Sequence, residues 1–397
     1  MFRRFIVWLS CAAALAAGTH SEGECKMPEI RAIWVARWDI ASPEACRTIV
    51  KVAKDHNFNA LIIQVRGRGD ALYDSRYEPR SELLDGQSRD FDPLALILDE
   101  GHRAGLQVHA WVNANYTWGA ADPPASPRHI VNAHPDWLMR TVDNKLEMVG
   151  GSDVEGAYTC PSNSVFRDFL RNIYMDVLRK YAVDGVHFDF IRYPSTRFCY
   201  CDRCLAKFKG EMDKKISVAE RLAVSNSPDR ISYTRAFPAA WDDFRREQIT
   251  KMVYAVYDSV KAFKPNVLVS ASVFPGFDDA YNHRFQDWKR WLRDGKLDIL
   301  FPMAYSKSTD TFAEHIRDAV ESSGPIPVCA GIGAWQIPAE SALEKVQKAR
   351  ELGAAGFCLF SWAVAKDGKD TSYLAYLRDH AMTDAVALPL VGLEEAK

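Results

Sequence analysis

The chain has 397 residues, of which 48% are hydrophobic and 26% are charged, so its composition is that of a globular protein and excludes disorder over most of its length. Its 50 Lys and Arg residues and 52 Asp and Glu residues give a formal net charge of −2. No excess of positive charge is available to neutralise a phosphate backbone, and we therefore expect no nucleic-acid partner.

The N-terminus has the pattern of a secretory signal peptide. Arg3 and Arg4 precede an apolar run from Phe5 to Ala17, and small residues at its end offer a cleavage site. The run is shorter than a typical membrane-spanning helix. The alternative to a cleaved signal peptide is an uncleaved N-terminal anchor. We predict a signal peptide over residues 1–22, export to the periplasm or the medium, and no stable membrane insertion after cleavage.

Eight short apolar runs predict the strands of the fold. They cover Arg31–Arg37, Ala60–Arg66, Gln107–Asn113, Gly185–Ile191, Val267–Phe274, Asp298–Tyr305, Pro327–Ile332 and Gly356–Trp362. Helical periodicity is found between or after them, at Pro43–His56, Asp92–Gly105, Val165–Tyr181, Trp241–Phe263, Phe285–Asp294, Thr311–Ser323, Ala339–Leu352 and Ser372–Met382. This alternation predicts the α/β class and a single (β/α)8 TIM barrel over residues 23–382, followed by a tail over 383–397. A doubly wound open sheet is the alternative, but no Gly-rich phosphate loop follows the first strand.

Two connections of the predicted barrel are long, and each follows a strand. A Pro-rich loop from Asp122 to Pro135 follows the third strand, and an insertion over residues 195–240 follows the fourth. Loops that follow the strands of such a barrel lie at its C-terminal mouth, where active sites of this fold are found. We therefore expect both expansions to shape a site.

Alternation within three strands places polar groups inside the barrel. The side chains expected to point inward are Gln64 and Arg66 in the second strand, His109, Trp111 and Asn113 in the third, and His187 and Asp189 in the fourth. Buried polar groups need partners, so a hydrogen-bond network is the alternative to a functional role, and we favour it for His187. For Asp189 we favour function, because Arg192 follows three residues later and can hold the carboxylate ionised.

Aromatic residues gather where the predicted strands end. They are Trp38, Trp111, Tyr116, Trp118, Tyr193, Tyr305, Trp335 and Trp362. Flat rings complement the apolar faces of sugar rings, while Asp, Asn and Arg satisfy hydroxyl groups. A carboxylate among such rings suits a nucleophile, or a stabiliser of an oxocarbenium-like transition state, in glycoside cleavage.

A series of motifs resembles the glycosyl-hydrolase-like family 10 proteins. In chain order they are Gln64-Val65-Arg66 with Gly69-Asp70-Ala71, Phe91-Asp92-Pro93-Leu94, His109-Ala110-Trp111-Val112-Asn113, Tyr181-Ala182-Val183-Asp184-Gly185-Val186-His187-Phe188-Asp189 and Arg192-Tyr193-Pro194. The resemblance extends from about Arg31 to Trp362. The chain departs from the family pattern at Gly67, where Pro is frequent, and at Asn113-Ala114-Asn115, which replaces Asn-Pro-Tyr.

The resemblance implies a barrel related to retaining glycosidases, in which the Asp that ends the fourth strand is the nucleophile. That residue is Asp189 here. The resemblance further implies cell-wall glycan, such as peptidoglycan strands, as the substrate. Residues expected to contact this glycan are Arg66, His109, Trp111, Asn113, His187, Arg192, Tyr193, Tyr305, Trp335 and Trp362.

A retaining glycosidase needs a second carboxylate about 5 Å from the first, and an inverting one needs it further away. We favour Asp70, which lies in the longest matched motif, and Glu78 next. The alternative is that Asp70 pairs with Arg66 or Arg68 and shapes the loop. Other acidic candidates at the mouth are Asp39, Asp74, Asp278 and Asp279.

Cys199, Cys201 and Cys204 form a C-x-C-x-x-C cluster, and Cys160 lies in the other long loop. Four thiolates can enclose one tetrahedral zinc ion and leave no open position, which makes the site structural. The arrangement resembles the zinc site of family 42 β-galactosidases, which are also barrels. Two disulfides are the alternative, because an exported protein meets an oxidising compartment.

Together these patterns predict an exported glycoside hydrolase that acts on a polysaccharide, with a structural zinc ion and no organic cofactor. One alternative is a barrel that binds carbohydrate and has lost its acid/base residue. A second is a metal-dependent polysaccharide deacetylase, which would require His109, His187 and Asp189 to gather around a metal ion.

Overall fold

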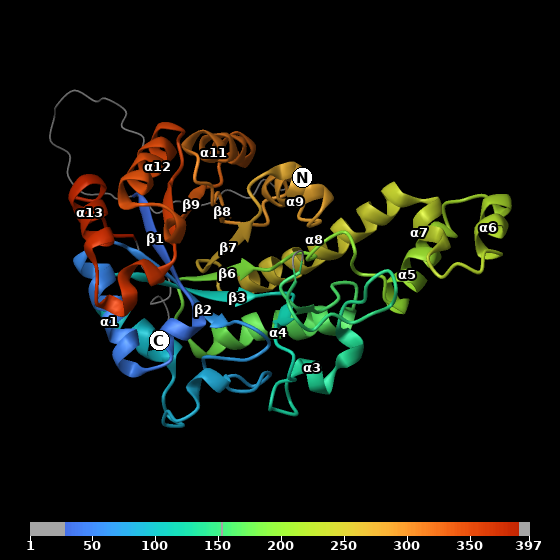
Figure 1. The fold of residues 1–397 in the computed structure, drawn as a ribbon, viewed down its shortest axis with the longest axis horizontal. Helices are drawn as coiled ribbons and strands as arrows, with labels where there is room; N and C mark the ends of the chain where they lie inside the picture. The colour runs from blue at the N-terminus through green and yellow to red at the C-terminus, as the bar shows by residue number, and fades with distance from the viewer. Residues whose placement is uncertain (1–27, 152–153, 389–397) are drawn as a thin grey trace.

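The computed structural model describes residues 28–151 and 154–388, so the predicted signal peptide lies outside the described residues. At its centre eight parallel strands form one sheet in the order β8-β7-β6-β3-β2-β1-β10-β9 (Figure 1). The strands are β1 (Ile30–Val35), β2 (Ala60–Arg66), β3 (Gln107–Asn113), β6 (Gly185–Asp189), β7 (Leu268–Val273), β8 (Ile299–Pro302), β9 (Cys329–Gly333) and β10 (Gly356–Phe360). The two end strands, β8 and β9, meet where Leu300 pairs with Val328, which nearly closes the barrel. The predicted (β/α)8 barrel is confirmed.

Helices alternate with the strands and surround them (Figure 1). They are α1 (Pro43–Asp55), α2 (Pro93–Arg103), α4 (Ser164–Lys180), α8 (Pro238–Phe263), α9 (Phe277–Asn282), α10 (Trp288–Arg293), α11 (Thr309–Ser323), α12 (Ala339–Glu351) and α13 (Ser372–Ala381). Local sequence sets where they start. Ser42 accepts a hydrogen bond from Ala45 N–H at 3.2 Å and Asp92 accepts one from Ala95 N–H at 3.0 Å, each just before a proline at the first helical position.

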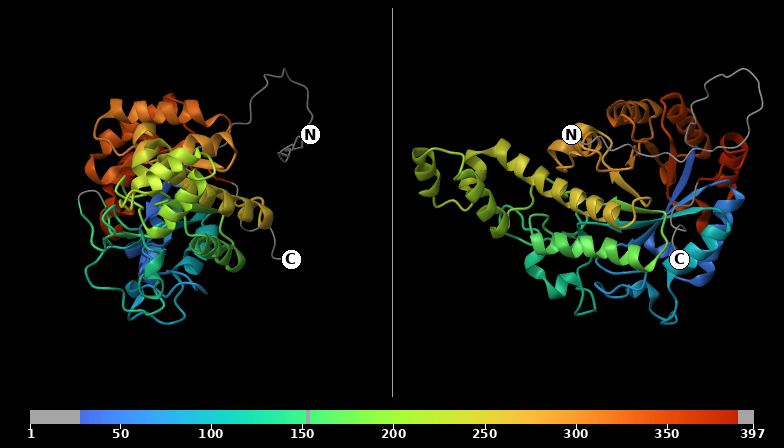
Figure 2. Two further views of the ribbon diagram at one scale, coloured as in Figure 1. Left: turned by 90° about the vertical axis from the view of Figure 1, so that its right-hand side faces the viewer. Right: turned by 180° about the vertical axis from the view of Figure 1, so that it is seen from behind.

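The two predicted loop expansions are present on the side of the strand C-termini. The connection after β3 contains an antiparallel pair, β4 (Tyr116–Trp118) and β5 (Ala157–Tyr158), and the short helix α3 (Ile130–Ala133). The insertion after β6 forms α5 (Asp202–Met212), α6 (Val218–Ser225) and α7 (Ser232–Ala236) before the long helix α8. Figures 1 and 2 show α6 and α7 far from the strands, beyond one end of α8.

Strand alternation sorts the core into two layers. Ile33 and Val35 of β1 pack outward against the helices, whereas Ala32 and Trp34 belong to a smaller cluster inside the barrel. Trp111 of β3 joins that inner cluster, as its position in the strand predicts.

The segment that follows α13 contacts the barrel over its described part. Arg31 donates a hydrogen bond from Nη1 to the Asp384 carbonyl oxygen at 2.5 Å, and Leu388 packs with the inner cluster. The beginning of the predicted tail therefore covers the N-terminal ends of the strands, while residues 389–397 lie outside the described part. Among the described helices, none has the length and apolar character needed to cross a membrane.

Candidate active site

A cavity of about 360 Å³ opens at the C-terminal ends of the strands. Its polar lining consists of Arg37, Gln64, Asn113, Glu155, Asp189, Arg192 and Ser272. Its aromatic lining consists of Trp34, Trp38, Trp111, Tyr116, Phe190, Tyr305 and Phe360. The predicted site residues that meet here are Asp189, Arg192, Trp111, Asn113 and Tyr305.

Asp189 ends β6 and points into this cavity from a mostly buried position. Its Oδ1 accepts a hydrogen bond from Phe190 N–H at 2.6 Å and lies 3.5 Å from Arg192 Nη1. Burial raises the pKa of Asp189 to about 6, because desolvation outweighs the attraction of Arg192 and the hydrogen bond from Phe190. The carboxylate is therefore ionised at neutral pH but gains its proton more readily than an exposed aspartate.

Glu155 is a second carboxylate of the cavity, and no sequence motif indicates it. It lies on the long loop after β3, and its Oε1 accepts a hydrogen bond from Arg192 Nη2 at 3.1 Å. The Tyr158 hydroxyl donates to its Oε2 at 2.5 Å. Burial acts to raise the pKa of Glu155, but Arg192 and Tyr158 outweigh it and hold the pKa below the ordinary value. One guanidinium thus contacts both Asp189 and Glu155.

Arg66 does not line the cavity, and the predicted inward direction is wrong for this residue. The register between β2 and β3 shifts between Gln64 and Arg66, so Gln64 pairs with Trp111 but Arg66 pairs with the outward-facing Val112. There Arg66 forms a fully buried ion pair with Glu78, with Nη2 and Oε1 2.7 Å apart. Glu78 is occupied by this pair and is also absent from the cavity lining.

Asp70 is also absent from the cavity lining. Its Oδ2 accepts a hydrogen bond from the Ser81 hydroxyl at 2.6 Å, and its Oδ1 accepts one from Arg68 N–H at 3.1 Å. The Arg68 guanidinium lies 3.9 Å from the same carboxylate. These contacts are the ones expected if Asp70 pairs with Arg68 and shapes its loop, which is the alternative to a catalytic role for Asp70.

The two predicted histidines form hydrogen bonds inside the barrel below the cavity lining. His187 contacts the Ser270 hydroxyl through Nδ1 and the Ser272 hydroxyl through Nε2, each at 2.8 Å, and burial holds its pKa well below the usual value. His109 contacts Gln107 Oε1 at 3.0 Å, and burial lowers its pKa to about 4. Both rings are therefore neutral at physiological pH, and for His187 the network interpretation holds.

The remaining predicted aromatic residues lie around the cavity and not in its lining. Tyr193 is fully buried against Phe285, with ring centroids 5.3 Å apart. Trp335 is half-exposed and contacts Tyr305 edge-on at 5.1 Å, which places it at the rim. Trp362 is buried beside a neighbouring cavity.

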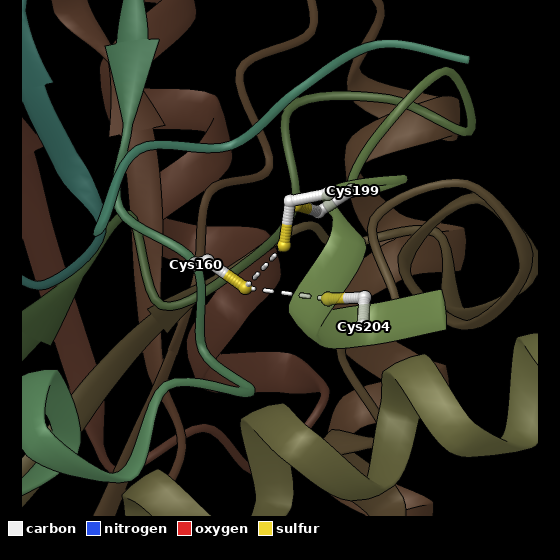
Figure 3. A group of neighbouring side chains, drawn as sticks. Cys160, Cys199 and Cys204 are labelled. Atoms are coloured by element: carbon white, nitrogen blue, oxygen red, sulfur yellow. Dashed lines mark hydrogen bonds between the residues drawn. The ribbon is translucent and has the colours of Figure 1, made fainter. Parts of the chain in front are cut away.

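The four predicted cysteine ligands come together and are all buried. Their Sγ atoms lie within 4.8 Å of one another, with Cys160 3.3 Å from Cys204 and 3.8 Å from Cys201. Figure 3 shows the sulfur atoms of Cys160, Cys199 and Cys204 turned toward one another. A tetrahedral zinc ion with four bonds of ~2.3 Å separates its sulfur ligands by ~3.8 Å, so this cluster fits such an ion. All four thiols are free, and the structure contains no disulfide among them.

The cysteine cluster joins the two loops that carry the carboxylates of the cavity. Cys160 follows Glu155 by five residues on the loop after β3, and Cys199 follows Asp189 by ten residues after β6. Tyr193 lies between Asp189 and Cys199 in the chain, and its hydroxyl is near enough to the cysteine thiols to interact with them electrostatically. A bound ion would therefore hold both loops at one point beside the cavity.

Carboxylates and aromatic walls at the C-terminal mouth of a (β/α)8 barrel are an arrangement that is found in glycoside hydrolases. The chain matches the family model described as glycosyl hydrolase-like 10 over residues 29–345. It belongs to this family, and the resemblance found in its motifs is confirmed.

The chain is also similar to a curated protein and, in its fold, to solved structures. The chain is 26% identical over 350 residues to "Glycosyl hydrolase YngK" of Bacillus subtilis, covering 78% of this chain and 61% of that protein. The PgaB glycoside hydrolase domain of Bordetella bronchiseptica has the same fold, with a TM-score of 0.65 at 14% identity over 89% of this chain and 98% of the domain. A catalytic mutant of Gan42B, a family 42 β-galactosidase from G. stearothermophilus, has a TM-score of 0.59 at 15% identity over 84% of this chain and 51% of its own. The chain thus spans under two thirds of the length of YngK.

Proposed function

We propose that the protein is an exported glycoside hydrolase that cleaves a polysaccharide at Asp189, with peptidoglycan glycan strands as its substrate. The observation that carries this proposal is a carboxylate at the end of β6, paired with Arg192 and enclosed by aromatic rings in one cavity. Such rings pack on the faces of sugars, and the carboxylate faces the space that a sugar would fill. Export is proposed from the N-terminal pattern.

We assign Asp189 as the nucleophile of a retaining mechanism and Glu155 as its acid/base partner. Asp189 is ionised at neutral pH and rigidly placed at a strand end, as a nucleophile requires. The Glu155 side chain is 45% exposed in the free protein. A sugar that covers it removes water and raises its pKa, which is the direction that a general acid needs.

Glu155→Gln is expected to lower glycan cleavage by about a hundredfold or more, whereas Asp70→Asn leaves cleavage within a few-fold of the unsubstituted protein. The reason is that Glu155 lines the cavity and Asp70 is held by Ser81 and Arg68 outside it. The measurement is the rate of new reducing ends for each variant. A loss of cleavage in Asp70→Asn with a normal rate in Glu155→Gln would restore Asp70 as the partner of Asp189.

The pH dependence of cleavage is expected to follow Asp189. Its pKa is raised from 3.8 to about 6, so the carboxylate becomes neutral as the pH falls through about 6 and ceases to act as a nucleophile. We expect kcat/KM to fall on the acidic side of that value. A kcat/KM profile that stays flat down to the ordinary aspartate range near 3.8 would contradict this assignment.

A panel of glycans, including peptidoglycan strands stripped of their peptides, tests the proposed function. New reducing ends support it, and their anomeric configuration distinguishes retention from inversion. Binding without cleavage would favour the carbohydrate-binding alternative. Released acetate would favour a deacetylase, for which the described residues provide no His and Asp metal group, since the cysteines form their one candidate cluster.

We propose that the cysteine cluster holds a structural zinc ion. Cys160, Cys199, Cys201 and Cys204 would be its ligands, and the sulfur separations support a tetrahedral site. Four thiolates leave no position for water or substrate, so the ion would take no part in the reaction. Its role would be to fix the loop after β3 to the insertion after β6.

A further inference from the structure

A second cavity of about 400 Å³ lies at the same mouth, within the size range of small-molecule sites, about 300–1,000 Å³. It is lined by three segments that follow strands, which are η1 (Arg37–Ile40) after β1, the loop between β2 and α2, and η5 (Trp362–Gly368) after β10. The start of α1 and the residues just before it complete the lining. Loops that follow barrel strands lie on the catalytic side. The second cavity is therefore on the face where a substrate of Asp189 would be held.

Trp38 lines both cavities and so lies at the boundary between them. Its side chain is 55% exposed, which is unusual for so large an apolar ring, and the Arg37 guanidinium lies 4.8 Å from the ring centroid. The ring is thus available at the boundary between the two spaces. A chain of sugars that crosses this boundary would pass over an aromatic surface.

Asp39 supplies a carboxylate to the second cavity from a position only 9% exposed. Its Oδ2 accepts a hydrogen bond from Ala36 N–H at 3.1 Å, and no cation pairs with it in the described part of the chain. Asp367 faces the same cavity and adds a like charge. A carboxylate with two oxygens can accept several hydrogen bonds, so Asp39 retains capacity for the hydroxyl groups of a ligand.

We propose that the second cavity binds a further neutral sugar residue of the same glycan chain that is cleaved at Asp189. Trp38 would contact the ring at the boundary, Asp39 would accept hydrogen bonds from sugar hydroxyls, and Gln87 would contact the far side. The protein would then cleave within long chains and prefer them to disaccharides. This inference rests on the proposed function and adds to it the length of substrate that the mouth holds.

The test measures binding to the full-length Asp189→Asn protein, which holds strands without cleaving them. The probes are a disaccharide and an octasaccharide prepared from stripped peptidoglycan strands. We expect the octasaccharide to bind roughly tenfold or more tightly than the disaccharide, and adding Asp39→Asn or Gln87→Ala to remove most of this gain. Asp85→Asn, an exposed acidic residue of the same loop outside both cavities, is the matched control and should keep the gain.

The outcomes separate this inference from the proposed function. Equal affinity for the two probes, or a gain that survives both Asp39→Asn and Gln87→Ala, overturns the second sugar position while leaving cleavage at Asp189 intact. If the octasaccharide is neither bound by the Asp189→Asn protein nor cleaved by the unsubstituted one, the proposed function fails and the second sugar position fails with it.

Discussion

Asp189→Asn is expected to lower glycan cleavage by at least ~10³-fold, because it removes the nucleophilic charge from the centre of the cavity. The fold should survive. Asparagine has nearly the same shape and can still accept the hydrogen bond from Phe190 N–H, and Arg192 keeps its contact with Glu155. The measurement is the rate of new reducing ends, together with the thermal unfolding temperature of the same preparation.

Asp278→Asn is the matched control for this prediction. Asp278 is an acidic residue of α9 near the mouth. Its Oδ1 accepts a hydrogen bond from Asn282 Nδ2 at 2.8 Å, and it does not line the cavity. The Asp278→Asn substitution should leave the rate of glycan cleavage within a few-fold of that of the unsubstituted protein. Unchanged turnover in Asp189→Asn would show that Asp189 takes no part in the reaction. A large drop in its unfolding temperature would show that cleavage is lost because the fold is destabilised.

Cys160→Ser is expected to remove most of the bound metal, to lower the unfolding temperature by several degrees and to reduce cleavage by up to about a hundredfold. Serine is a poor zinc ligand, and three thiolates hold the ion less tightly than four. The loop that carries Glu155 would then no longer be held to the metal at residue 160, five residues further along the chain. Glu155 could shift as a result, and small displacements of a reacting group lower the reaction rate by large factors. The measurements are zinc content per chain, thermal unfolding and cleavage rate.

Cys46→Ser is the matched control, because Cys46 is also buried and free but lies on α1, away from the cluster. It should keep the metal and the cleavage rate. Purified protein with no metal and with two disulfides among Cys160, Cys199, Cys201 and Cys204 would refute the zinc proposal.

Much of the barrel could be predicted because its signals are local. Each strand is a short apolar run, and helices such as α1 and α2 begin at a capping residue followed by proline. Alternation also placed Trp111, Asn113 and Asp189 inside the barrel correctly. It failed at Arg66, because the register shift after Gln64 turns the following residue to the other face.

The second carboxylate could not be predicted from the chain, since no motif surrounds Glu155. It is separated from Asp189 by 34 positions, and loop residues of that kind carry no periodicity. One signal was available: Cys160 follows it closely, and a shared metal site with Cys199 would have brought that loop to Asp189. Asp70 is instead the residue that a conspicuous motif indicates, whereas the structure shows Ser81 and Arg68 as its partners.

The amino-acid order by itself determined the eight strand-and-helix repeats of the barrel, the aspartate at the end of its fourth strand and the spacing of three cysteines. These depend on neighbours in the chain, whose geometry a strand or a helix repeats. Only the tertiary structure decided which acidic side chains share the cavity, since that depends on how long loops return to the mouth. The Arg192 contacts to Asp189 and Glu155 join the end of β6 to the loop after β3, and such a meeting exists only once the barrel has closed.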